Sequence, residues 1–194
     1  MGDKSVTLGS NDFELFDVPV RFSQDRAALD ARWKELQREA HPDRFAAQPG
    51  AAQRLAMQWS VRINEAYQRL KDPLRRAAYL CELGGAPINA ENNTAMPKQF
   101  LMQQMEWREA LAAASSEAEL DRLNALVQES RHDALVRCEE FIDVQHDYTL
   151  AAGQVRALMF IERFSSDIEA HSERLESAPH PADPPPAATS VARQ

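Results

Sequence analysis

Residues 38 to 45 read REAHPDRF, and within this stretch His41 and Asp43 flank Pro42. An imidazole and a carboxylate so close together could act as a general base with its partner, or as metal ligands. Catalysis would also require a nucleophile and donors for the developing charge. The chain contains no HExxH, no glycine-rich phosphate loop and no Gly-x-Ser-x-Gly. An enzyme is therefore disfavoured, and we expect no catalytic residue, no metal site and no cofactor.

The same three residues can also be interpreted as the end of a helix. A histidine in the last turn interacts favourably with the helix macrodipole, and the residue before a proline is pushed out of the α region. Turns, however, more often use glycine or asparagine. Three distinctive side chains at a solvent-facing bend are thus also typical of a surface that contacts another protein. The tripeptide alone leaves both interpretations open.

Composition narrows the classes of function. The 194-residue chain is 44% hydrophobic and carries a formal net charge of −8, the wrong sign for binding nucleic acid through its phosphates. No apolar run is long enough to span a bilayer, and the N-terminus lacks a signal peptide. Cys81 and Cys138 form no CxxC and are expected to be small buried apolar groups. We expect a cytoplasmic protein that contacts neither nucleic acid nor membrane.

Helical periodicity dominates the chain and no alternating strand pattern stands out, which predicts an all-α fold. One amphipathic helix begins at a cap formed by Ser23 or Asp25 and ends before Pro42. Its apolar stripe comprises Leu29, Trp33, Leu36 and Ala40. A short helix before it is predicted at NDFELF, with Asn11 and Glu14 at capping-box spacing.

A second long helix follows a polar turn. Its predicted apolar stripe comprises Leu55, Trp59, Ile63, Ala66 and Leu70. Two such helices joined by a loop make a helical hairpin. Pro73 begins a shorter helix, which Gly84 and Gly85 end. Residues 1–10 are expected to be flexible.

The second half of the chain predicts a small antiparallel three-helix bundle. Residues 84–96 are rich in Gly, Pro and Asn and are predicted to form a linker. Helices are then expected over about 97–114, from a capping box at Ser116 and Glu119, and over about 150–175. Residues 177–194 are proline-rich and are predicted to be disordered.

The first helix of this bundle has two apolar faces. One is predicted to be core: Phe100, Trp107 and Leu111. The other gathers two acidic residues around three apolar ones: Leu101, Met102, Met105, Glu106 and Glu109. This second face is either a partner surface or is buried by the neighbouring helices. Phe160 lies at the edge of the stripe of the last helix and could join either the core or that surface.

The arrangement of an amphipathic helix, His-Pro-Asp and a second long helix resembles a J domain. The resemblance implies that His41, Pro42 and Asp43 activate the ATPase of a DnaK-type chaperone, assisted by the basic face of the preceding helix. On that face Lys34 and Arg38 are expected to point to solvent, and Arg44 adds charge beyond the loop. Residues 25–40 nevertheless hold four basic and four acidic side chains, so the helix is charge-balanced.

Over residues 11–176, with FLMQQMEWRE and VRALMFIERF as the most specific stretches, the chain resembles the HscB family, the J-type co-chaperones of iron–sulfur cluster biogenesis. The resemblance implies a J domain (11–83), a linker (84–96) and a scaffold-binding bundle (97–176) in a bacterial protein that delivers the scaffold IscU to the chaperone HscA. The matching scaffold contacts are Leu101, Met102, Met105, Glu106, Glu109 and Phe160. Ala113 departs from the acidic residue of some relatives. The alternatives are a general J-domain co-chaperone with a different client, and a structural helical adaptor.

Overall fold

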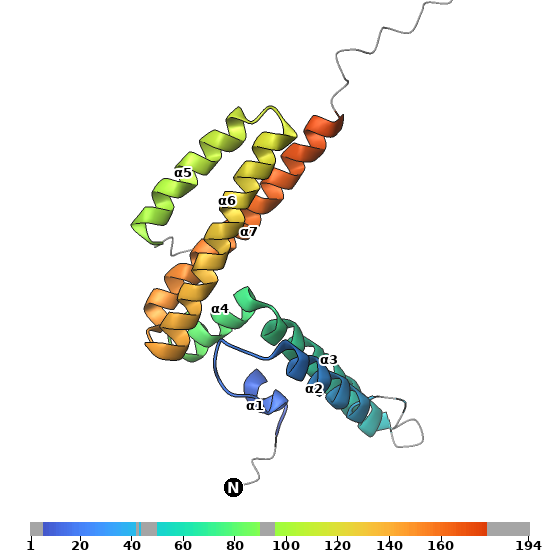
Figure 1. Ribbon diagram of the computed structural model, residues 1–194. Helices are drawn as coiled ribbons and strands as arrows, with labels where there is room; N and C mark the ends of the chain where they lie inside the picture. The colour runs from blue at the N-terminus through green and yellow to red at the C-terminus, as the bar shows by residue number, and fades with distance from the viewer. Residues whose placement is uncertain (1–5, 42, 44–49, 90–95, 178–194) are drawn as a thin grey trace, which may run out of the picture.

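The structure, a computed structural model, describes residues 6–41, 43, 50–89 and 96–177. Within these residues every regular element is a helix, which confirms the all-α fold (Figure 1). In chain order the helices are α1 (Asp12–Phe16), α2 (Arg26–Glu39), α3 (Gly50–Lys71), α4 (Pro73–Leu83), α5 (Lys98–Ala113), α6 (Glu117–Glu139), the π-helical turn η2 (Glu140–Val144) and α7 (Tyr148–Ser177). None of these described helices is long and apolar enough to cross a membrane. Most of the two predicted flexible ends, residues 1–5 and 178–194, lies outside the described residues.

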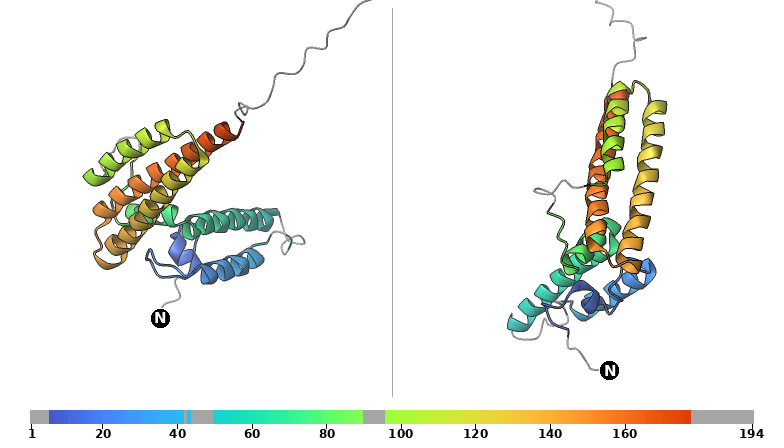
Figure 2. Two further views of the ribbon diagram at one scale, coloured as in Figure 1. Left: turned by 45° about the horizontal axis from the view of Figure 1, so that its top comes forward. Right: turned by 90° about the vertical axis from the view of Figure 1, so that its left-hand side faces the viewer.

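Helices α2 and α3 lie side by side as the predicted hairpin (Figure 2). Leu29 and Leu36 of α2 pack with Ile63 and Leu70 of α3 in one buried cluster. Leu55, predicted on the same stripe, is 48% exposed, so that prediction is wrong. The buried stripe is centred between the directions of Ile63 and Leu70, which leaves Leu55 at its margin.

Side-chain caps define where the first two helices begin. The Asp25 carboxylate accepts hydrogen bonds from the backbone N–H groups of Ala27 and Ala28, at 2.8 and 3.2 Å, and so selects Asp25 over Ser23 as the cap of α2. Asn11 and Glu14 form the predicted capping box of α1. These bonds satisfy backbone donors that a helix start otherwise leaves unpaired.

A buried carboxylate ties α1 to α3. Asp12 is fully buried and lies 2.6 Å from an Arg62 guanidinium nitrogen and 2.8 Å from one of Arg69. Its backbone N–H also donates to the Tyr79 hydroxyl of α4, at 3.1 Å. A carboxylate removed from water is tolerable only when it is paired and hydrogen-bonded in this way. Asp12 therefore anchors the short first helix on the hairpin.

Asp12→Asn is expected to lower the free energy of unfolding by about 3 kcal/mol, because the neutral amide leaves two arginines without their buried counter-ion. Urea unfolding followed by circular dichroism measures the loss. Glu35→Gln is the control, since it breaks the largely solvent-accessible Arg32–Glu35 pair at 2.6 Å and should cost about 0–1 kcal/mol. Equal losses in the two variants would contradict the role of Asp12.

The hairpin and the bundle share one hydrophobic core. Helix α4 packs across the base of the bundle, against α7, so that the two arms diverge from a common junction (Figures 1 and 2). The shared core contains Ala77, Leu80 and Cys81 of α4 together with Cys138, Ile142, Ala151 and Val155 of the bundle. At Gly84 a Cβ atom would lie 2.3 Å from the Tyr148 ring, so only glycine fits this close approach of the two parts.

Polar contacts reinforce the junction. The Asp143 carboxylate of η2 accepts the backbone N–H groups of Phe22 and Ser23, at 2.6 and 2.9 Å. Where the chain leaves α4, the Arg156 side chain of α7 donates a hydrogen bond to the carbonyl oxygen of Ile88, at 3.1 Å. Ile88 is itself buried, so the beginning of the predicted linker packs against the bundle. These contacts hold the two arms at one relative orientation.

Both cysteines are free and fully buried in this shared core, as predicted. Burial raises the pKa of the Cys81 thiol to about 12 and that of the Cys138 thiol to about 12. The described residues contain no cluster of three or more His, Cys, Asp or Glu side chains able to hold a metal ion.

A second core holds the far half of the bundle together. It contains Phe100 and Trp107 of α5, Leu120, Leu123 and Val127 of α6, and Ala157, Ile161, Phe164 and Ile168 of α7. Ser116 is the N-terminal cap residue of α6 as predicted, but its side chain accepts no capping bond. Glu119 instead accepts from the backbone N–H of Ser115, at 2.8 Å, so the predicted capping box is wrong in detail.

Candidate functional site

The first candidate surface is the tip of the hairpin. His41 follows directly on the C-terminal cap of α2, Ala40. The side chains of His41 and Asp43 are 56% and 91% exposed, and His41 Nδ1 lies 3.7 Å from Asp43 Oδ2. The same Nδ1 accepts the backbone N–H of Asp43, at 3.3 Å. Side chains this accessible are arranged for contact with another molecule rather than for acid–base chemistry in a water-excluded pocket. Pro42 and Arg44 lie outside the described residues.

Two ion pairs within α2 neutralise part of its charge. Arg26 Nε lies 2.7 Å from Asp30 and Arg32 pairs with Glu35 at 2.6 Å, so half of the basic residues of this helix are neutralised locally. The pKa of Asp30 is lowered by its hydrogen bond from the Tyr67 hydroxyl and by Arg26.

Lys34 and Arg38 are both exposed and lie on one face of α2, four residues apart, leading to His41. Of the four basic residues of α2, these two lie closest along the helix to the tip of the hairpin. Lys34 and Arg38 therefore place positive charge on the side of α2 that leads to the tip.

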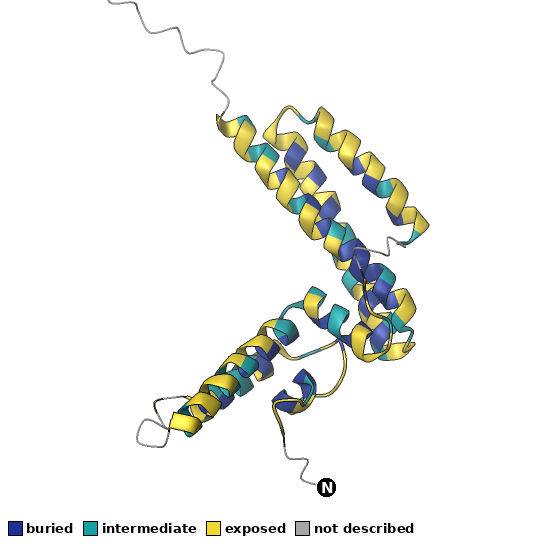
Figure 3. Cartoon of the chain, turned by 180° about the vertical axis from the view of Figure 1, so that it is seen from behind, coloured by how far each residue is buried: buried dark blue, intermediate teal, exposed yellow. Residues whose placement is uncertain are grey.

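The second candidate surface is the outer face of α5, whose residues are predominantly exposed (Figure 3). Leu101, Met102 and Met105 are 42%, 67% and 65% exposed, and Glu106 and Glu109 are exposed beside them. The opposite face buries Phe100, Gln104 and Trp107. The alternative in which the bundle buries both faces of this helix is thus wrong. Exposed Leu and Met side chains grouped in one patch are typical of a protein-binding surface.

Phe160 joins this face to the core. Its ring stacks on Phe164 with centroids 5.7 Å apart and meets Phe100 edge-on at 5.7 Å. The residue is only half-buried, so part of the ring stays accessible. The Arg108 guanidinium lies 5.3 Å from the ring centroid, within the range of a cation–π contact. Sequence reasoning did not single out Arg108, although its position seven residues after Leu101 places it on the same flank of α5.

The two surfaces lie on different arms of the molecule. The tip of the hairpin is at one end and α5 is on the far side of the bundle, and the views in Figures 1 and 2 agree on this separation. The structure therefore gathers the predicted residues into two sets and does not bring the sets together. An arrangement of this kind can hold two different proteins at once.

Comparison with known proteins decides the family. Residues 96–169 match the family model described as the HSCB C-terminal oligomerisation domain. The chain is 50% identical over 175 residues to a co-chaperone protein HscB homolog of Burkholderia multivorans, covering 89% of this chain and 99% of that one. It is 48% identical over 174 residues to the homolog of Paraburkholderia xenovorans, with 89% and 99% covered. The chain belongs to the HscB co-chaperone family.

Solved structures of the family have the same fold. The chaperone HscB from Vibrio cholerae superposes with a TM-score of 0.78 at 38% identity, over 85% of this chain and 99% of that one. The human co-chaperone protein HscB superposes with a TM-score of 0.79 at 28% identity, over 86% and 84% of the two chains. The family confirms the expected role, a co-chaperone of iron–sulfur cluster biogenesis with an N-terminal J domain and a C-terminal helical bundle.

Proposed function

We propose that this chain binds the iron–sulfur scaffold IscU, delivers it to the DnaK-type chaperone HscA and stimulates the ATPase of HscA in the bacterial cytoplasm. The observation that carries the proposal is the presence of two exposed surfaces of different chemistry on one frame. The hairpin tip is polar and basic, whereas the outer face of α5 is apolar and acidic. Since one core joins the arms, a scaffold held on α5 stays at a defined position relative to the tip.

We assign the ATPase contact to residues 11–83 and the scaffold contact to residues 97–176. Toward HscA, Pro42 would set the shape of the loop while His41 and Asp43 present their polar groups. Lys34, Arg38 and Arg44 would add charge complementary to an acidic partner surface, which speeds association and fixes orientation. The ATP would be hydrolysed in HscA, so this chain acts as an activator.

Toward IscU, the apolar anchors would be Leu101, Met102 and Met105, with part of the Phe160 ring at the edge of the patch. Glu106 and Glu109 would form its polar rim. Buried apolar anchors ringed by charged groups provide most of the binding energy in interfaces of this kind. Hydrolysis of ATP on HscA would then trap the delivered scaffold and assist cluster transfer.

The ATPase rate of HscA, measured with this chain alone, with IscU alone and with both, tests the proposal. We expect stimulation by this chain, and a greater stimulation by both together than the sum of the two separate effects. Stimulation that IscU does not change would indicate a general J-domain co-chaperone with another client. The absence of any stimulation would favour a structural adaptor.

A further inference from the structure

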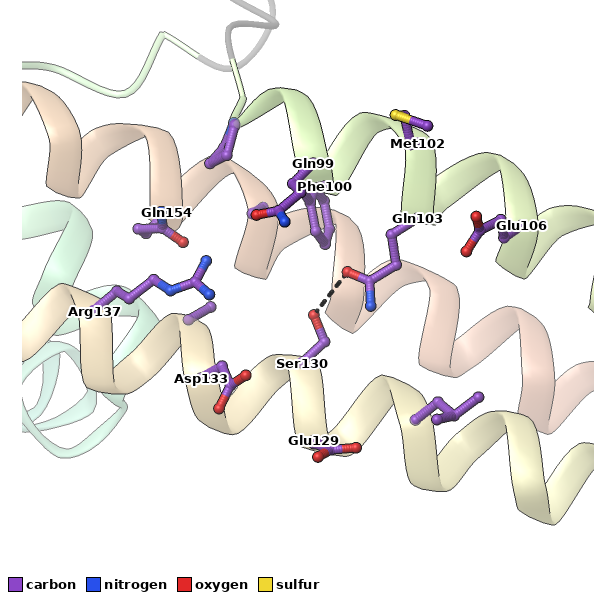
Figure 4. A pocket seen from close by; sticks show the side chains of 14 residues that line it. Gln99, Phe100, Met102, Gln103, Glu106, Glu129, Ser130, Asp133, Arg137 and Gln154 are labelled. Carbon is purple, nitrogen blue, oxygen red and sulfur yellow. Dashed lines mark hydrogen bonds between the residues drawn. The ribbon is translucent and has the colours of Figure 1, made fainter.

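A groove of about 450 Å³ runs between α5 and α6, next to the proposed scaffold surface (Figure 4). Met102 and Glu106 of that surface also line the groove. Within the groove one hydrogen bond joins the two helices in the described part of the chain, from Ser130 Oγ to Gln103 Oε1 at 3.4 Å.

The groove is negatively charged. Its lining includes the carboxylates of Glu106, Glu129 and Asp133, and one guanidinium, that of Arg137. None of these three carboxylates forms an ion pair with a residue that the structure describes. These three carboxylates outnumber the one guanidinium, so the groove favours a cationic group over an anionic one.

A buried amide faces the same space. Gln154 of α7 is only 6% exposed and lines the groove near Arg137, as Figure 4 shows. Its side chain makes no hydrogen bond to a described residue, so its amide is free to pair with a group that enters the groove. The amide oxygen is an acceptor suited to an incoming N–H donor.

From this geometry we propose that the groove receives a lysine or arginine side chain of the protein docked on the outer face of α5. Glu129 and Asp133 of α6 are then specificity-determining residues, in addition to those on α5. The inference rests on the proposed function and deepens it, because it states the charge that the scaffold protein must present. Glu106 belongs to both surfaces, so a partner that covers Met102 also covers the mouth of the groove.

The side of α5 that faces α7 carries mostly positive charge, opposite to that of the groove. The cleft between α5 and α7 is lined by Arg108, Arg163 and Arg174, with one carboxylate, Asp167. Only the α6 side therefore attracts a basic side chain, while the α7 side repels it. Opposite charges on the two flanks of one helix admit the partner in a single orientation.

Binding of IscU to the full chain, measured by isothermal titration calorimetry at low and at physiological salt, tests the proposal. The groove variant is Glu129→Lys with Asp133→Lys. The matched control is Asp121→Lys with Glu139→Lys, which makes the same change of net charge at exposed positions of the same helix outside the groove. We expect the groove variant to bind at least about tenfold more weakly than the control, with the difference reduced by salt. Changing the responsible basic residue of IscU to Glu should restore binding to the groove variant alone.

Equal affinities of the groove and control variants would overturn the proposal. If in that case Leu101→Ala with Met105→Ala still weakens binding, the proposed scaffold surface stands and only the groove is excluded. Failure of IscU to bind the unmodified chain would overturn both. Should circular dichroism show the groove variant unfolded, Glu129→Gln with Asp133→Asn replaces it, with a loss of about threefold expected from the neutralised charges.

Discussion

His41→Gln is expected to abolish the stimulation of HscA while changing the free energy of unfolding by less than about 0.5 kcal/mol. The imidazole is 56% exposed, and its contacts within the described chain are with the neighbouring Asp43. Its removal therefore leaves no cavity and no buried group unpaired. The effect should fall on the partner, because the group proposed to contact the ATPase is lost while the helix before it remains.

The ATPase rate of HscA at saturating IscU measures this effect, and thermal unfolding checks the fold. His132→Gln is the matched control, since it makes the same change at an exposed histidine of α6, away from the hairpin. The control should stimulate like the unmodified chain. Full stimulation by the His41 variant would exclude the proposed role of the tip.

Replacing Leu101 and Met105 together by Ala is expected to weaken IscU binding by about 30-fold or more. Each apolar anchor of an interface typically contributes on the order of 1–2 kcal/mol, and about 1.4 kcal/mol corresponds to a factor of ten in affinity. The fold should survive, because both side chains are exposed, at 42% and 65%.

Titration with IscU measures the loss, and urea unfolding confirms that stability is retained. Leu150→Ala with Met57→Ala is the matched control, since it truncates one exposed leucine and one exposed methionine, 49% and 60% accessible, outside the α5 face. Both double variants should unfold at similar urea concentrations. A large loss of stability with unchanged affinity of the folded fraction would show that the α5 residues support the fold instead.

Much of this architecture was predictable because its determinants are local. The capping box of Asn11 and Glu14 and Pro73 at the first turn of α4 act within a few residues of the chain, and both occur as predicted. The start of α2 was predicted as a cap at Ser23 or Asp25, and Asp25 forms it. The same holds for the two faces of α5, because a helix of known period places Met102 and Trp107 on opposite sides whatever surrounds it. Local caps and periodicity therefore predict helices and their faces reliably.

Two details of the helices were predicted wrongly, the burial of Leu55 and the capping bonds of α6. Leu55 was predicted buried because its stripe was judged along α3 alone, whereas the angle at which α2 crosses α3 sets the margin of the buried face. The exposure of Leu55 thus depends on packing between helices, which the periodicity of α3 alone does not contain. Ser116 is the N-cap of α6 as predicted, but the bonds of its predicted capping box with Glu119 differ, since Glu119 accepts from the backbone N–H of Ser115, one residue earlier.

By itself, the sequence determined the all-α class, the placement of His41, Pro42 and Asp43 between two amphipathic helices, and the pairing of apolar with acidic residues on α5. Only the tertiary structure decided that α4 and the base of the bundle share one core, that Gly84 must pass against Tyr148, and that an acidic groove opens between α5 and α6. The physical reason is the distance along the chain between the residues that interact. Helix formation and amphipathic faces depend on residues a turn apart, whereas junctions and grooves depend on which distant surfaces bury each other.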